Sequence, residues 1–228
     1  MSTATTSPAQ AVQEDQVFVM NNVEWGQYVA VNDALSERAG LRMTYLDGRL
    51  TLVSPTRRHE WHSDVFDGIV KAVANGCGID WEPAVSTTYR VEELEAGVEG
   101  DRTYYFGQHA ILMGGPTEVD LATQPPPDLA IEIEYTNPVT DALVIYDRLG
   151  VPEVWRYNVK KDALTFLHRK PEGGYEPAPR SLALPMLGPD DVLGQLRRSA
   201  EMKSSRRWSE QLAAWVRDVI LPRLDRAR

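Results

Sequence analysis

Hydrophobic residues recur along the chain at two spacings, one typical of helices and one typical of strands. Helical spacing is found over residues 23–39 and 59–75, and a glycine follows each stretch. Hydrophobic and polar residues alternate on both sides of Asp47-Gly48, a dipeptide that favours a two-residue hairpin turn. Further strands are predicted over residues 103–106, 128–134, 154–157 and 164–168. With 228 residues, the chain is long enough for one sizeable core.

The two ends of the chain differ from its body. Residues 1–17 are rich in Ser, Thr, Ala and Gln, which predicts a disordered leader. Residues 197–228 hold nine basic and four acidic side chains, a net charge of +5, with apolar residues at helical spacing. This segment predicts a basic amphipathic helix that packs on the domain or on a second copy of the chain, or else contacts nucleic acid. The domain itself is expected over residues 18–196.

Composition excludes several classes of protein. Hydrophobic residues make up 43% of the chain and charged residues 25%, as in ordinary globular proteins. The net charge of −9 is opposite in sign to that of a nonspecific nucleic-acid coat. A single cysteine excludes an internal disulfide framework and a multi-cysteine zinc module. Without a bilayer-length apolar run or a signal peptide, we expect a cytoplasmic protein that does not enter the membrane.

The predicted strand over residues 128–134 carries the candidate chemistry. Its odd-numbered residues are apolar, whereas Asp128, Glu132 and Glu134 share the opposite face. Carboxylates at this spacing raise one another's pKa unless a cation lies between them, and Mg²⁺ or Mn²⁺ is the usual cation. The alternative is an edge strand whose polar face meets solvent.

Two other segments contribute candidate residues. Glu99 and Asp101 precede the predicted strand over 103–106, and they join the carboxylate cluster if that strand lies beside 128–134; otherwise they are solvated loop charges. His59 opens the helix over 59–75, a position suited to contact with a phosphate or substrate. The sequence HEWH lacks the HExxH spacing, so we expect no histidine-based zinc site.

Four segments resemble the Uma2 family, the restriction-endonuclease-like group of the PD-(D/E)XK superfamily. They are YLDGRLTLVSPTRRHE, GVEGDRTYYF, PPPDLAIEIEYTNP and IYDRLGVPEVWRYNV, within a resemblance that runs from about Trp25 to Leu196. The resemblance implies an α/β restriction-endonuclease-like core, a mixed β-sheet flanked by helices, with the C-terminal helix added to it. It also implies a site that uses Mg²⁺ or Mn²⁺ to cleave phosphodiesters.

Position by position, the resemblance implies a role for five side chains. Asp101 and Glu132 are expected to hold the metal ion, and Asp128 is expected to assist them. His59 and Glu60 fall on the amino-terminal motif that lines the cleft. All five are therefore candidate catalytic residues.

The family's catalytic lysine is missing from this chain. Its two possible positions hold Glu134 and Ala142. Because the lysine stabilises negative charge in the transition state, its loss favours a slow or inactive enzyme; Arg102, Arg148 and Lys160 are candidates to replace it.

We expect a metal-dependent endonuclease that acts on nucleic acid, DNA rather than RNA, and forms a homodimer through its C-terminal helix. The alternative is a catalytically silent nuclease-fold module that binds nucleic acid or a protein partner. A third possibility is an acidic scaffold without a ligand.

Overall fold

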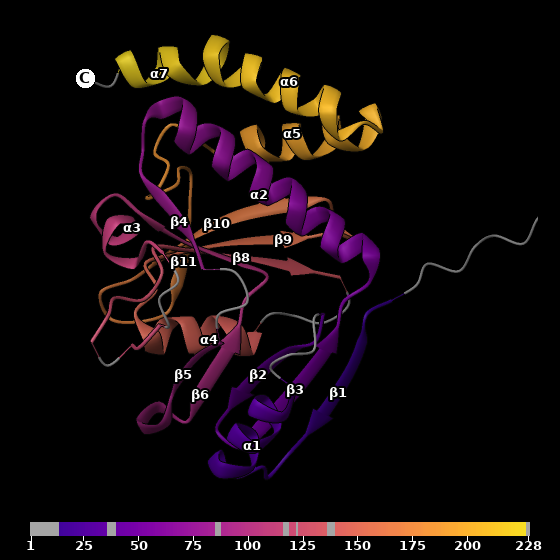
Figure 1. Cartoon of the computed structure of the whole chain (residues 1–228), viewed down its shortest axis with the longest axis vertical. Helices are drawn as coiled ribbons and strands as arrows, with labels where there is room; N and C mark the ends of the chain where they lie inside the picture. The colour runs from indigo at the N-terminus through magenta and orange to yellow at the C-terminus, as the bar shows by residue number, and fades with distance from the viewer. Residues whose placement is uncertain are drawn as a thin grey trace, which may run out of the picture.

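Two β-sheets form the frame of the protein in the computed structural model, which describes residues 14–35, 40–84, 88–115, 119–121, 123–135 and 140–226 (Figure 1). The smaller sheet contains, in spatial order, β1 (Gln16–Met20), β3 (Arg49–Ser54), β2 (Arg42–Leu46), β6 (Ala96–Glu99) and β5 (Thr88–Val91). The larger sheet contains β11 (Tyr175–Ala178), β10 (Ala163–Arg169), β9 (Glu153–Asn158), β8 (Leu129–Glu134), β7 (Arg102–Phe106) and β4 (Trp81–Pro83). In the larger sheet β8 and β9 are parallel, whereas β7 and β8 are antiparallel. The expected mixed sheet is confirmed.

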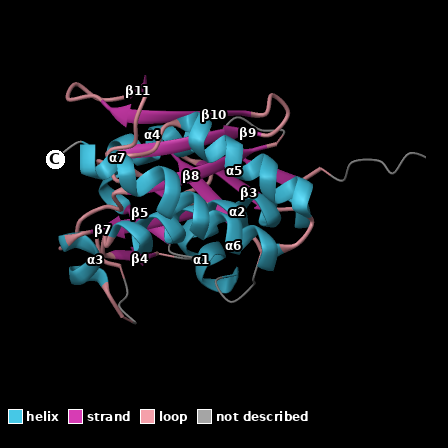
Figure 2. Ribbon diagram, turned by 90° about the horizontal axis from the view of Figure 1, so that it is seen from above, coloured by secondary structure: helices cyan, strands magenta, loops and turns pink. Residues whose placement is uncertain are grey.

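Helices cover the sheets and separate them (Figures 1 and 2). Helix α1 (Trp25–Leu35) packs on the smaller sheet, and α4 (Thr140–Leu149) lies between the two sheets. Helix α2 (Arg57–Cys77) crosses the opposite face of the larger sheet. The connections contain the 3₁₀ turn Glu92–Leu94 and the short helix α3 (Gln108–Met113). None of the described helices is long and apolar enough to span a membrane.

The hairpin predicted at Asp47-Gly48 is confirmed. These two residues join β2 to β3 between Leu46 and Arg49, which face each other in the antiparallel register. Asp47 has φ 47° and Gly48 has φ 81°, the positive values that a type I′ turn requires at both central positions. The turn therefore sets which residues of β2 and β3 share a face.

Strand β1 corrects the predicted extent of the disordered leader. It pairs antiparallel with β3, with Gln16 opposite Ser54 and Met20 opposite Leu50. The prediction for residues 1–17 was therefore wrong for Gln16 and Val17, because pairing with β3 stabilises a segment whose composition indicates little structure. Residues 1–13 lie outside the described part of the chain.

Strand β8 lies inside the larger sheet rather than at its edge. It pairs with β7 on one side and with β9 on the other, and all six of its residues are buried. The edge-strand alternative is therefore wrong. Carboxylates on a buried strand must find partners inside the molecule, because an unpaired buried charge is costly.

The basic C-terminal segment packs on α2 as two layers of helix. It comprises α5 (Pro189–Met202), α6 (Ser205–Trp215), the π-helical turn Val216–Ile220 and α7 (Leu221–Arg226). The predicted boundary at residue 197 falls inside α5, because one helix already begins at Pro189.

The apolar face of this segment is buried within the chain. It consists of Trp208, Leu212, Val216 and Ile220, which belong to the core that also contains α2. A Cβ at Gly76 of α2 would lie 2.4 Å from Val216, so the glycine permits this close packing. The predicted packing on the domain is confirmed, and the expected homodimer gains no support because the predicted contact face is used internally.

Candidate functional site

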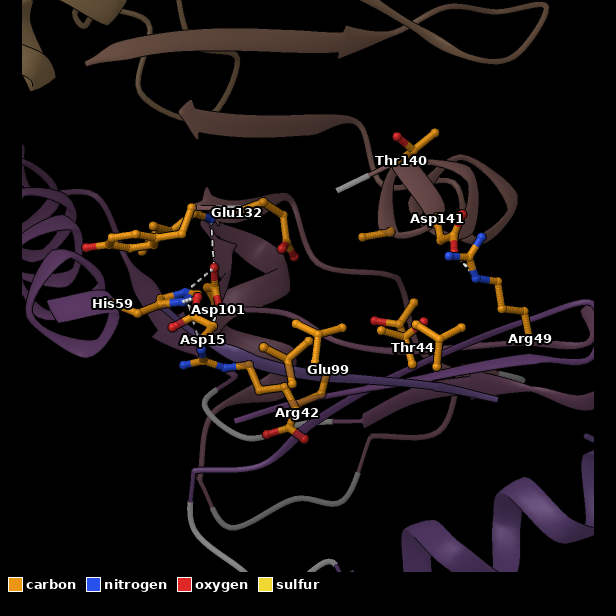
Figure 3. A pocket seen from close by; sticks show the side chains of 17 residues that line it. Asp15, Arg42, Thr44, Arg49, His59, Glu99, Asp101, Glu132, Thr140 and Asp141 are labelled. Carbon is orange, nitrogen blue, oxygen red and sulfur yellow. Dashed lines mark hydrogen bonds and ion pairs between the residues drawn. The ribbon is translucent and has the colours of Figure 1, made fainter. Parts of the chain in front are cut away.

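A cavity of about 340 Å³ lies between the smaller sheet, β8 and the first turns of α2 and α4 (Figure 3). Its apolar lining includes Val17 and Val53 of the smaller sheet and Ile133 of β8. The charged side chains in its wall are mostly acidic: Asp15, Glu99, Asp101, Glu132 and Asp141 are accompanied by Arg42, Arg49 and His59. Figure 3 shows Asp101, Glu132 and His59 on one side of the cavity and Asp141 with Arg49 on the other.

The strand register brings Asp101 and Glu132 together. The chain leaves the smaller sheet after β6 and enters the larger sheet at β7 through Gly100 and Asp101. Strand β7 then pairs antiparallel with β8, with Arg102 opposite Ile131. This register places Asp101 next to Glu132, so the predicted approach of the two strands is confirmed.

The carboxylate of Asp101 is buried and bonded on both oxygens. Its Oδ1 lies 2.7 Å from Nη1 of Arg42, and its Oδ2 lies 2.9 Å from Nε2 of His59. Oδ2 also accepts the backbone N–H of Ile133 at 2.7 Å. Burial opposes the charge of Asp101, but Arg42 and His59 outweigh it and lower the pKa of this carboxyl. Asp101 is therefore ionised at neutral pH.

Glu132 is equally buried but less well compensated. Its Oε1 accepts a hydrogen bond from the hydroxyl of Tyr146 on α4 at 2.7 Å. Burial and the negative charge of Asp101 raise the pKa of Glu132 to about 8. The site thus holds a carboxyl group that a nearby cation would keep ionised at neutral pH, which is typical of functional sites.

Gly100 makes room for the contact between Tyr146 and Glu132. A Cβ on Gly100 would lie 2.3 Å from the Tyr146 hydroxyl oxygen and 3.3 Å from Oε1 of Glu132. Any other residue at this position would displace Tyr146, so the glycine is needed for close approach rather than for a turn.

His59 lies between two carboxylates. Its Nδ1 is 3.1 Å from Oδ2 of Asp15, and its Nε2 is 2.9 Å from Oδ2 of Asp101. Burial opposes the charged form of the ring, but Asp101 and Asp15 together raise the pKa of His59 to about 9. The imidazole is therefore protonated at neutral pH and donates from both nitrogens.

Glu60 contacts Arg42 but does not line the cavity. Its Oε1 accepts from Nη2 of Arg42 at 3.0 Å, while Nη1 of the same guanidinium contacts Asp101. The Glu60 side chain is 43% exposed and lines a smaller recess together with Arg42, Glu99 and Asp101. The structure therefore places Glu60 beside the site and His59 inside it.

Asp128 lies at the opposite end of β8 from the acidic pair. Its carboxylate accepts the backbone N–H of Phe106 at 2.7 Å and lies 2.8 Å from Nδ1 of His109. Four residues of extended chain, about 13 Å, separate it from Glu132 along the strand. The structure does not bring Asp128 to the cavity.

Neither position of the family's lysine supplies a cation to the cavity. Glu134 forms an ion pair with Arg156 of β9 at 2.9 Å. Ala142 is a small residue in the cavity wall. The three residues suggested as replacements do not line the cavity, because each has an acidic partner elsewhere: Arg102 pairs with Asp64, Arg148 with Asp47, and Lys160 with Glu14.

Other charged residues also line the cavity: sequence reasoning had named Glu99 as a candidate but had missed Arg42, Arg49 and Asp15. Arg42 contacts Asp101 directly, and Arg49 lies with its Nε 3.6 Å from Asp141. Asp15 contacts His59, and Glu99 adds a further carboxyl group whose pKa burial raises. Alternation in β2 offers a signal for Arg42, since Arg42 and Thr44 face away from the buried Met43 and Tyr45. No comparable signal exists for Asp15.

The model of one known family matches most of the chain. The model of the Uma2 family, described as "Putative restriction endonuclease", matches residues 25–201. No curated protein was found to match the chain. The two-sheet α/β architecture flanked by helices is consistent with the restriction-endonuclease-like fold. Because the match spans well over half of the chain, the protein belongs to the Uma2 family.

Proposed function

We propose that this protein is a divalent-metal-dependent nuclease that hydrolyses phosphodiesters of nucleic acid, with DNA as the expected substrate. The observation that carries the proposal is the pair formed by Asp101 and Glu132, two buried carboxyl groups on adjacent strands that face one cavity. Membership in a family described as "Putative restriction endonuclease" supports the same reaction class.

The donor set fits Mg²⁺ or Mn²⁺. Within the described residues, no group of three or more His, Cys, Asp or Glu side chains is arranged to hold a metal ion. Mg²⁺, however, is usually bound by one or two carboxylates, with waters and substrate phosphates as further ligands. Asp101 and Glu132 supply two such carboxylates. Asp128 is left out of this ligand set, because it does not line the cavity and lies about 13 Å from Glu132 along the extended chain.

Excess negative charge in the cavity favours a bound cation. The pKa of Glu132 is raised to about 8 by burial and by Asp101, and burial raises the pKa of Glu99 as well. A dication would remove the electrostatic cost of ionising these groups. When bound, it neutralises phosphate charge and lowers the pKa of an attacking water.

The chain's own cations have two roles in this proposal. Arg42 and His59 hold Asp101 in a fixed orientation through contacts of 2.7 and 2.9 Å. They also place positive charge at the cavity, where the phosphate gains negative charge as its bond to the leaving oxygen breaks. Arg49, across the cavity, is suited to contact a neighbouring phosphate of the substrate strand.

The experiment is a cleavage assay on plasmid DNA, single-stranded DNA and RNA with Mg²⁺, with Mn²⁺ and with EDTA. We expect cutting only with metal, and a loss of at least about 100-fold in Asp101→Asn and in Glu132→Gln. Asp128→Asn is the matched control, because it changes a carboxylate on the same strand face away from the cavity, and it should cut like the wild type. The proposal fails if no substrate is cut with either metal, or if cutting survives in both cavity variants.

A further inference from the structure

The first strand brings an acidic residue from outside the family-matched range to the cavity. Because β1 runs antiparallel to β3 with Gln16 opposite Ser54, Asp15 lies beside the link from β3 into α2. Asp15, Val17 and Val19 line the cavity. As alternate residues of an extended segment, they share one face.

Asp15 uses its two carboxylate oxygens for two different contacts. Oδ1 accepts the backbone N–H of Thr56, the residue that caps α2, at 2.7 Å. Oδ2 lies 3.1 Å from Nδ1 of His59, one turn further along the helix. The Asp15 side chain is only 6% exposed, so both contacts are sheltered from water.

We infer that Asp15 is a positioning residue for the nuclease site: it holds the His59 ring so that the opposite ring nitrogen faces Asp101. This role rests on the proposed function, and it explains what fixes the orientation of His59 in the nuclease site. With Nδ1 on Asp15 and Nε2 at 2.9 Å from Asp101, both ring nitrogens are engaged and the ring plane is fixed. A histidine oriented by a second carboxylate is a recurring way to fix its donor geometry.

A purely structural role for Asp15 would need only its contact with Thr56. That contact caps α2 and is independent of the orientation of the His59 ring. The substitution Asp15→Asn separates the two roles, because the amide oxygen can still accept the Thr56 N–H while the amide nitrogen cannot accept the N–H of Nδ1. Glu14→Gln is the matched control, since Glu14 is the adjacent acid and lies 3.6 Å from Lys160 at the surface.

The test combines kinetics with a spectroscopic readout of the ring. In ¹⁵N-edited spectra of the full chain, assigned by their loss in His59→Gln, the wild type should show slowly exchanging N–H signals from both nitrogens of His59. Asp15→Asn should lose or shift the Nδ1 signal while its melting temperature stays close to that of wild type. Cleavage should show kcat lower by about 10- to 100-fold with KM changed less than about threefold. Glu14→Gln should match the wild type in all three measurements.

The outcomes separate this inference from the proposed function. An unchanged His59 spectrum in Asp15→Asn overturns the inference, and so does an altered spectrum with unchanged kcat in an active wild type. If the wild type cuts no substrate, the proposed function fails, while the spectrum still decides whether Asp15 orients the ring. A change in melting temperature without a change in the His59 signals would assign Asp15 to the capping role alone and would also overturn the inference.

Discussion

The hydroxyl of Tyr146 donates a hydrogen bond to Oε1 of Glu132 at 2.7 Å, so helix α4 supports a side chain of the acidic pair directly. Both residues are buried. The contact favours the ionised form of Glu132, in opposition to burial and to Asp101, which raise its pKa. This contact requires glycine at position 100, because a Cβ there would overlap the Tyr146 hydroxyl.

Substitution of Tyr146 by Phe should weaken metal binding more than it weakens the fold. Without the hydroxyl, the pKa of Glu132 rises further, and a cation must then displace a more tightly held proton. We expect a higher Mg²⁺ concentration for half-maximal cleavage and a loss of about 1–3 kcal/mol in unfolding free energy. Tyr89→Phe is the control, because the Tyr89 hydroxyl contacts Thr103 at 3.0 Å outside the cavity wall. Equal metal dependence in the two variants would contradict the assignment.

The stability of the metal-free protein should fall as the pH rises from about 5 to about 9. In the folded protein the pKa of Glu132 is about 8, against 4.5 for an ordinary glutamate, and that of His59 is about 9, against 6.5 for an ordinary histidine. Both groups therefore bind more protons in the folded state over this window, and their stabilisation, complete at low pH, is lost as the pH passes the folded values. Asp101, with its lowered pKa, loses its own contribution only at strongly acidic pH.

Thermal unfolding in EDTA at pH 6 and at pH 9 measures this effect. The wild type should melt at a lower temperature at pH 9 than at pH 6. In Glu132→Gln, whose side chain does not ionise, the melting temperature should fall less between these two pH values. Added Mg²⁺ should stabilise the wild type most at high pH, where the acidic pair carries its full charge. A melting temperature that does not change from pH 6 to pH 9 would contradict the assigned pKa directions.

The polar face that carries Glu132 and the hairpin could be predicted from the sequence, because local rules determine them, whereas the approach of Asp101 to Glu132 depends on the pairing of β7 with β8. Alternation in residues 128–134 separates an apolar from a polar face, and Asp47-Gly48 has the backbone preferences of its turn. Alternation does not say how far along a strand a site extends, so Asp128 was grouped with Glu132 although the two lie at opposite ends of the strand. Asp15 could not be found at all, because its role comes from the pairing of β1 with β3 across a long sequence separation.

Removal of Trp208 should destabilise the whole domain, because the C-terminal helices are part of its core. The Trp208 side chain is 6% exposed, and its ring lies so close to Gly68 of α2 that a Cβ there would be 2.8 Å away. Trp208→Ala should cost about 3–5 kcal/mol of unfolding free energy in denaturant titrations. Trp61→Ala is the control. Because Trp61 is 36% exposed, this substitution should cost much less unfolding free energy. Equal losses would mean that the helices do not pack on α2 as described.

A lysine at position 142 should increase cleavage, because Ala142 lies in the cavity wall, at a position where the resemblance to the family implies a catalytic lysine. Negative charge on the transferred phosphate is stabilised by a fixed cation, an effect of about 100-fold or more for a single contact. The new side chain also meets Asp141 and Glu132, whose charges offset part of the cost of burying an ammonium group. We therefore expect Ala142→Lys to fold and to raise kcat in the plasmid assay by at least about 10-fold.

Thr140→Lys is the matched control. Thr140 lines the same wall two positions before Ala142, so this substitution adds the same charge at a different place in the cavity. A gain in both variants would indicate a general electrostatic attraction for nucleic acid, which would disappear at high salt. A gain in Ala142→Lys alone, which persists at high salt, assigns the missing charge to that position. If the wild type is silent while Ala142→Lys cuts, the proposed nuclease activity fails for this protein, and its site is that of a former nuclease that lost the cation but kept the acidic pair. An absence of cutting in both, with Mg²⁺ bound and the fold intact, would favour the silent binding module instead.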